Sequence, residues 1–142
     1  MIERVVFDTS TLIGAALKFG SKPHQALTLA LGSCVICICE QELAELAEVL
    51  NRSSLERYLT RSDRDRFLAL IRERTQIVEI DEMVGTALDP PCRDPKDNFI
   101  LALSIAARAS VIVSSDHDLL VLHPWRGIPV LSPAQFVSQF LG

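Results

Sequence analysis

Short apolar runs alternate along this chain with longer stretches in which apolar residues recur at the spacing of an α-helix. The runs expected to form strands are 5–7, 33–39, 76–80, 111–113 and 128–131. Helical spacing follows most of them, and at least two of the runs are apolar on both faces. This alternation is typical of an α/β protein with a mostly parallel sheet covered by helices on both sides. Pro129 lies in the last run and favours an edge or a late-joining position for that strand.

The helices are delimited by periodicity and by capping residues. We expect them at 12–17, 26–31, 40–51, from 53 onward, 62–75, 94–107, 119–122 and 132–141. Asp94 is the expected N-cap of the sixth of these, with a proline in the first helical position. Neither a repeat nor a linker interrupts the pattern, so 1–142 is expected to form a single domain.

Composition narrows the class of protein further. With 49% hydrophobic residues the chain is too apolar to be disordered, and no stretch approaches the roughly 20 apolar residues of a membrane span. The start of the chain lacks the pattern of a secretory leader, which favours a cytoplasmic protein. The net charge of −4 argues against a protein that coats nucleic acid with a uniformly basic surface.

Three of the four cysteines lie within the second apolar run. Cys34 and Cys37 have the spacing of a thiolate metal site, but in an extended strand they point to opposite faces, and no second pair follows. We therefore interpret the run as a buried strand in which cysteine acts as a small apolar residue.

Four carboxylates occur where the expected elements meet. Asp8 follows the first strand and Asp116 follows the strand 111–113. Asp97 lies in the first turn of the helix that leads to that strand, and Glu45 lies in the helix after the cysteine run. Because ligands of an open α/β sheet bind at the carboxyl ends of its strands, we expect the four to converge there.

Each carboxylate taken singly also has a structural explanation. Asp8 and Asp116 are suited to cap helices, and Asp97 is favourable in a first helical turn. Glu45 can be a solvated helix residue, as we expect for its neighbours Glu42 and Glu48.

Taken together the four carboxylates indicate a metal site. Carboxylates that converge repel one another and raise each other's pKa, so a cation must neutralise them. Oxygen ligands select Mg²⁺ or Mn²⁺, and such a site supports hydrolysis of a phosphodiester bond.

Four segments of the chain resemble the motifs of PIN-domain proteins, in the order in which that family has them. They are Val5-Val6-Phe7-Asp8-Thr9-Ser10-Thr11-Leu12, Glu45-Leu46-Ala47-Glu48-Val49-Leu50-Asn51-Arg52, Arg93-Asp94-Pro95-Lys96-Asp97-Asn98 and Val113-Ser114-Ser115-Asp116-His117-Asp118-Leu119-Leu120. The resemblance implies a PIN-like three-layer α/β/α fold with a central sheet of four to five strands. It implies a metal-dependent endoribonuclease of the VapC-like branch, the toxins of bacterial toxin–antitoxin pairs.

The resemblance also implies roles for individual residues. The catalytic, metal-binding acids are Asp8, Glu45, Asp97 and Asp116, and the ion is Mg²⁺ or Mn²⁺. Supporting positions are Ser10, Asp94, Ser114 or Ser115, and Asp118. Ser10 departs from the family, which usually has Asn there. The implied partners are an RNA substrate, a cognate antitoxin protein and a second copy in a homodimer, and no membrane.

Residues 51–75 hold seven arginines against four acidic residues, half of all the basic residues of the chain. Arg52, Arg57 and Arg61 are candidate RNA contacts on this segment. The alternative is a solvated helical face with ion pairs such as Arg61 with Asp65.

Two other functions compete with a ribonuclease. One is a catalytically degenerate PIN domain that serves as an RNA-binding or scaffold module, which Ser10 keeps open. The other is a haloacid-dehalogenase-like phosphatase, which needs a second aspartate where this chain has Ser10.

Overall fold

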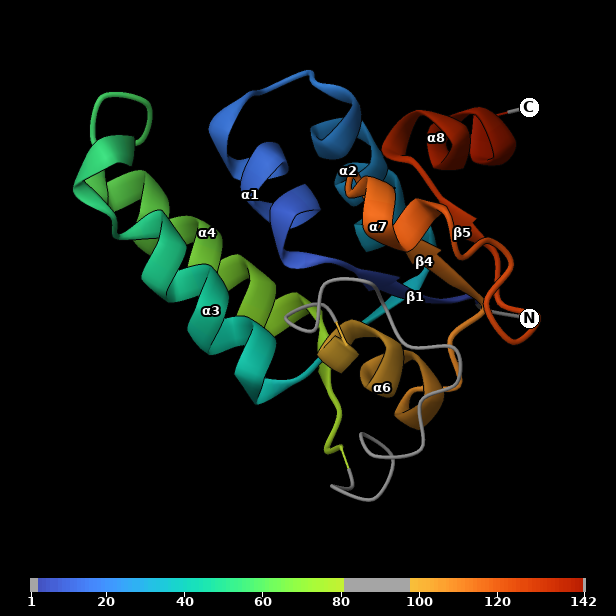
Figure 1. Cartoon of the computed structure of the whole chain (residues 1–142). Helices are drawn as coiled ribbons and strands as arrows, with labels where there is room; N and C mark the ends of the chain where they lie inside the picture. The colour runs from blue at the N-terminus through green and yellow to red at the C-terminus, as the bar shows by residue number, and fades with distance from the viewer. Residues whose placement is uncertain (1–2, 81–97, 142) are drawn as a thin grey trace.

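A five-stranded parallel sheet forms the centre of the molecule (Figure 1). The computed structural model describes residues 3–80 and 98–141. The strands are β1 (Arg4–Phe7), β2 (Val35–Ile38), β3 (Gln76–Ile77), β4 (Val111–Val113) and β5 (Val130–Leu131). Their order is β3-β2-β1-β4-β5, and every neighbouring pair is parallel. The expected α/β class is thereby confirmed, and β5 with its preceding Pro129 lies at an edge.

Helices connect the strands. They are α1 (Thr9–Leu17), α2 (Lys22–Ser33), α3 (Glu40–Leu50), α4 (Arg61–Arg74), α6 (Asn98–Ala106), α7 (His117–Leu120) and α8 (Pro133–Leu141), with a 3₁₀ turn η1 (Ser53–Leu55). The helix α2 begins earlier than expected because the Ser21 side chain accepts a hydrogen bond from the backbone N–H of His24. The capping pattern at Ser53 predicts an α-helix, but the structure has only a 3₁₀ turn there.

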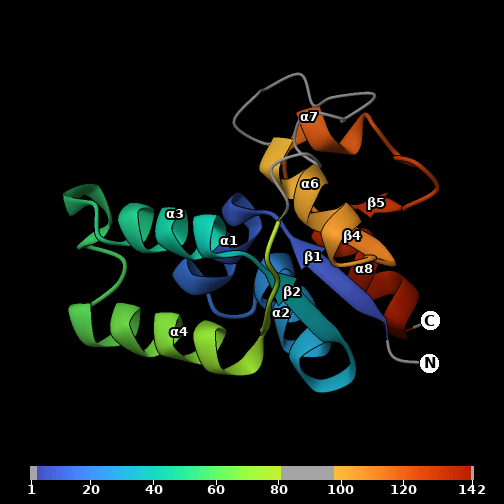
Figure 2. The same cartoon turned by 90° about the horizontal axis from the view of Figure 1, so that it is seen from below.

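Alternating side chains of the strands divide the core into two layers. Val5 and Phe7 face the layer built by α1, α2, α3, α4 and α8, whereas Val6 faces the layer built by α6 and α7. Figure 2 shows α6 and α7 on one side of the sheet and α2 and α8 on the other. This is the three-layer α/β/α arrangement expected for the chain.

The cysteine run is a buried strand, as interpreted from the sequence. Cys37 and Cys39 belong to the core layer of α6, and Cys34 packs against the opposite layer. These three cysteines are free thiols. Cys92 lies outside the described residues. Within the described ranges no helix is long and apolar enough to cross a membrane.

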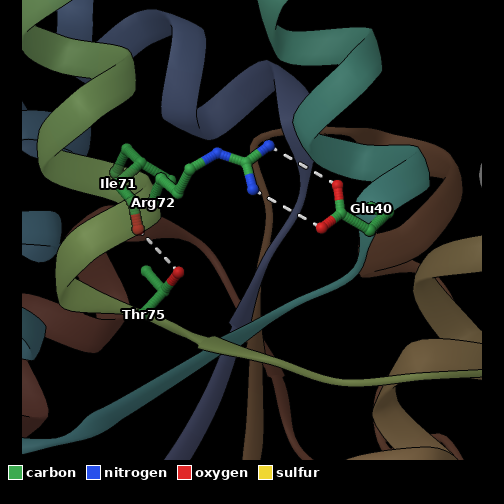
Figure 3. A network of polar contacts seen from close by, with 4 residues as sticks. All are labelled: Glu40, Ile71, Arg72 and Thr75. Carbon is green, nitrogen blue, oxygen red and sulfur yellow. Dashed lines mark hydrogen bonds and ion pairs between the residues drawn. The ribbon is translucent and has the colours of Figure 1, made fainter.

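The helices α3 and α4 form an antiparallel pair whose connecting turn lies far from the sheet (Figures 1 and 2). Leu50 and Ile71 join their faces in the core. At the end near the sheet, Arg72 forms an ion pair with Glu40 at 3.5 Å, and Thr75 Oγ1 donates a hydrogen bond to the Ile71 carbonyl (Figure 3). Both charged side chains of that ion pair are mostly exposed, so apolar packing is the main force that holds the pair of helices together.

Candidate active site

Asp8 lies directly after β1 and is almost completely buried, with 3% of its surface exposed. Its carboxylate caps α1 by accepting a hydrogen bond from the Thr11 backbone N–H at 2.9 Å. The other oxygen, Oδ2, accepts hydrogen bonds from Ser10 Oγ at 3.1 Å and Ser114 Oγ at 2.5 Å. Burial raises the pKa of Asp8, although these hydrogen bonds oppose the increase. Ser10 therefore keeps a contact with Asp8 at the position where the family usually has Asn.

Asp116 lies one strand away, after the end of β4, and is joined to Asp8 through Ser114. The Ser114 hydroxyl is fully buried; it donates to Asp8 and accepts a hydrogen bond from the Asp116 backbone N–H at 2.9 Å. Asp116 caps α7 by accepting from the Asp118 backbone N–H. Both aspartates are thus helix caps, and the parallel pairing of β1 with β4 places them at the same edge of the sheet.

The neighbouring hydroxyls form a second link between the two loops. Thr11 Oγ1 accepts a hydrogen bond from the Ser115 backbone N–H at 3.0 Å and contacts Ser115 Oγ at 3.2 Å. Of the two serines expected to orient the site, Ser114 contacts the Asp8 carboxylate and Ser115 contacts Thr11. The start of α7 is consequently fixed against the start of α1.

The helix α3 contributes two glutamates, one of which sequence reasoning placed wrongly. Glu45 is half-buried. Glu42 was expected to be solvated, but none of its surface is exposed. Both of its carboxylate oxygens are buried without a hydrogen-bond partner in the described part of the chain. Burial, followed by the charges of Asp8 and Glu45, raises the pKa of Glu42 well above its usual value. Glu42 therefore faces the same acidic region.

A signal for Glu42 was present in the sequence. The buried face of α3 carries Leu43, Leu46 and Leu50. Residue 42 precedes Leu46 by four positions, so it shares the buried stripe of the helix. Residue type nevertheless predicts a solvated side chain at position 42, because glutamate is rarely buried without a partner.

Two of the expected site residues, Asp94 and Asp97, lie outside the described residues. Among residues 3–80 and 98–141, no group of three or more His, Cys, Asp or Glu side chains is arranged to hold a metal ion. The donors that the described residues do bring together are carboxylate and hydroxyl oxygens, and Glu42 supplies an unpartnered buried carboxylate. This donor chemistry fits a hard divalent ion such as Mg²⁺ or Mn²⁺.

The arginine-rich segment lies along the pair of helices α3 and α4. Arg52, Arg57 and Arg61 are exposed at the turn far from the sheet, and Arg52 pairs with Glu48 at 3.3 Å. Arg64 is instead buried and donates to the Leu50 carbonyl, so it is not available to a ligand. Ion pairs do occur on this helical face, but the pair is Arg66 with Asp63 rather than the expected Arg61 with Asp65.

Comparison with known proteins decides the family. The model of the PIN domain matches residues 4–118, most of the chain. The chain belongs to the PIN-domain family. The matched range contains all of the acidic residues considered above. A comparison with curated proteins finds no match.

The fold is also similar to that of solved structures. The crystal structure of PAE2754 from Pyrobaculum aerophilum matches with a TM-score of 0.67 and 14% sequence identity, covering 99% of this chain and 90% of that chain. At this identity the likeness concerns the fold alone. PIN domains are generally nucleases and typically use divalent metal ions. The chain therefore has a fold that generally carries nuclease activity.

Proposed function

We propose that this chain is a metal-dependent endoribonuclease that hydrolyses phosphodiester bonds of RNA. The observation that carries the proposal is a pair of strand-end aspartates at one edge of the sheet, with the buried carboxylate of Glu42 on the neighbouring helix α3. Asp8 and Asp116 meet there through Ser114, and α3 directs Glu42 toward the same region. Such a concentration of acids is costly unless a cation neutralises it.

The residues proposed to hold the ion are Asp8, Glu45, Asp97 and Asp116. A divalent ion bound there supplies an activated water and stabilises the charged oxygens of the phosphate. The protein contributes orientation, because Ser10, Ser114 and the Thr11 backbone fix the Asp8 carboxylate before any ligand arrives.

Cleavage of labelled RNA by the purified chain tests the proposal. We expect cleavage with Mn²⁺ or Mg²⁺, none with EDTA, and a decrease of about 100-fold or more in Asp8→Asn, since even outer partners of metal ligands cost up to about 100-fold. Glu48→Gln is the matched control, because Glu48 lies on α3 with a side chain that is 69% exposed. Cleavage that persists unchanged in Asp8→Asn would contradict the proposal.

A degenerate PIN domain predicts a different result in the same experiment. Its metal site can still bind Mn²⁺ and raise the melting temperature, but RNA is left uncut by every variant. The hydrogen bond from Ser10 to Asp8 favours the active enzyme, since the serine that replaces the usual Asn of the family still orients the carboxylate. Asp97→Asn should abolish the Mn²⁺-induced stabilisation under either function.

We further propose that the chain is the toxin of a toxin–antitoxin pair and acts as a homodimer. Both proposals extend the resemblance of its motifs to the VapC-like branch of the family. Induced expression should arrest growth, and co-expression of a small protein encoded beside it should restore growth. Growth that is unaffected by the active enzyme would contradict the toxin role.

A further inference from the structure

Glu42 is the described residue that the motif pattern leaves unexplained. It is not Glu45, the one glutamate that the resemblance assigns to the metal site, and it lies on the buried face of α3 in the first turn of that helix. Its carboxylate is fully buried, and neither oxygen has a hydrogen-bond partner among the described residues. A polar group in such a place is normally paired, and a charged one is normally paired or bound to a metal.

The surroundings of Glu42 do not supply the missing partner. The described charges that act on it are those of Asp8 and Glu45, and both are negative. On α4, Arg72 is engaged elsewhere, since it pairs with the exposed Glu40 at the start of α3 (Figure 3). Hydrogen bonds orient Asp8 through both of its oxygens, whereas the Glu42 oxygens keep all of their acceptor capacity.

Helical spacing determines where this carboxylate lies relative to Glu45. Residues three apart on a helix are surface neighbours, with about 5–6 Å between their Cβ atoms. Glu42 and Glu45 therefore present two carboxylates from one side of α3, with Glu42 the deeper of the two. The helix α1, whose N-cap is Asp8, contacts α3.

We propose that Glu42 is an additional ligand of the divalent cation, bound to it directly or through one coordinated water. This inference rests on the proposed function, because it assigns a residue to the same site. The motifs assign no ligand role to Glu42, so this inference adds one carboxylate, from the buried face of α3, to the proposed ligands. The cation would supply the partner that both Glu42 oxygens lack in the described structure.

Binding of Mn²⁺ by wild type and Glu42→Gln, measured by calorimetry and by the rise in melting temperature, tests the assignment. We expect Glu42→Gln to bind Mn²⁺ about tenfold or more weakly. In EDTA the same variant should melt at a higher temperature than wild type, because a neutral amide replaces a buried carboxylate without a partner. A purely structural role for Glu42 gives no loss of Mn²⁺ affinity.

Two further variants keep the test decisive. Glu42→Leu places an apolar side chain in the apolar stripe; it should fold and also bind Mn²⁺ weakly. Glu48→Gln removes one charge from an exposed position of the same helix and should change the affinity by less than about twofold. Mn²⁺ affinities in both Glu42 variants equal to wild type would overturn the inference.

The outcomes separate this inference from the proposed function. If wild type binds Mn²⁺ and cuts RNA but the Glu42 variants bind equally well, only the role of Glu42 is wrong. If the Glu42 variants lose Mn²⁺ affinity but no protein cuts RNA, the ligand role stands and the ribonuclease does not. Wild type that binds neither Mn²⁺ nor Mg²⁺ overturns both.

Discussion

A single hydroxyl, that of Ser114, joins the two strand-end aspartates of the candidate site. It donates to Asp8 and accepts from the Asp116 backbone, and it is fully buried. Buried hydrogen bonds of this kind orient their neighbours because no water competes for the polar atoms. The relative position of Asp8 and Asp116 therefore depends on a residue that need not contact a ligand itself.

Ser114→Ala is expected to lower the free energy of unfolding by about 1–3 kcal/mol, because it leaves the Asp116 N–H without its acceptor and removes one donor from Asp8. Urea denaturation measures the loss. Ser54→Ala is the control, since Ser54 is exposed and its substitution should change stability by about 0.5 kcal/mol or less. Equal stabilities of the two variants would show that the buried link contributes nothing.

Sequence reasoning identified strand-end residues well and helix-face residues less well. Asp8 and Asp116 could be placed because each follows an apolar run, and parallel strands end at a common edge. Glu42 could not be recognised from residue type, since glutamate in a helix is usually solvated. Its burial depends on how α3 packs against α1 and the sheet, which is a tertiary property.

The same distinction applies to the elements. Strands and most helices follow from apolar periodicity, and β5 was expected at an edge because Pro129 lacks an N–H. The exact lengths did not follow: β3 is limited to Gln76–Ile77, although the apolar pattern continues to Ile80. Pairing with β2 sets that limit, and a pairing partner is not visible in a local sequence pattern.

The pair of helices α3 and α4 connects the acidic site to the arginines at its far turn. Glu45 and Arg52 are seven residues apart, roughly 10 Å along a helix at about 1.5 Å per residue. An RNA strand that enters the site could therefore meet Arg52, Arg57 and Arg61 with neighbouring phosphates. Under the proposed function, the positive charge of this turn complements the RNA phosphates, and the negative charge of the site complements a divalent cation.

Replacing Arg52, Arg57 and Arg61 together by Gln is expected to weaken binding of single-stranded RNA and to make it less sensitive to salt. Loss of three phosphate contacts should reduce the slope of log K against log salt by about 2. Fluorescence anisotropy at several salt concentrations, with EDTA present, measures it. The control replaces Arg66, Arg72 and Arg74, of which Arg66 pairs with Asp63 and Arg72 with Glu40. Equal slopes in the two triple variants would exclude a specific role of the turn.

At the scale of the whole molecule, the net charge of −4 conceals an uneven distribution. Asp8 and Asp116 lie together at the carboxyl edge of the sheet, while arginines gather on α4 and the turn before it. The fold thus places acidic groups in a buried region. Among the described residues, the Glu42 carboxylate has no hydrogen-bond partner there. This arrangement costs stability in the metal-free protein, and the cost depends on pH.

Between pH 5 and pH 8 in EDTA, the metal-free protein is expected to lose stability as pH rises. Burial raises the pKa of Asp8 and, more strongly, of Glu42 in the folded state, so the folded chain holds protons that the unfolded chain has already released. Stability then falls with increasing pH from the ordinary carboxyl pKa, about 4, up to the raised values. The urea midpoint at pH 5 and pH 8 measures the decrease.

Glu42→Gln isolates the contribution of the carboxylate that lacks partners, because the buried Asp8 carboxyl group stays in place in the variant. Its midpoint should decline less between pH 5 and pH 8 than that of wild type. Saturating Mn²⁺ should stabilise wild type most at the higher pH, since a metal binds deprotonated carboxylates. A wild-type midpoint that rises with pH in EDTA, with the same slope in Glu42→Gln, would mean that the Glu42 carboxylate is already compensated within the folded chain. The acidic edge of the sheet would then need no cation to be stable.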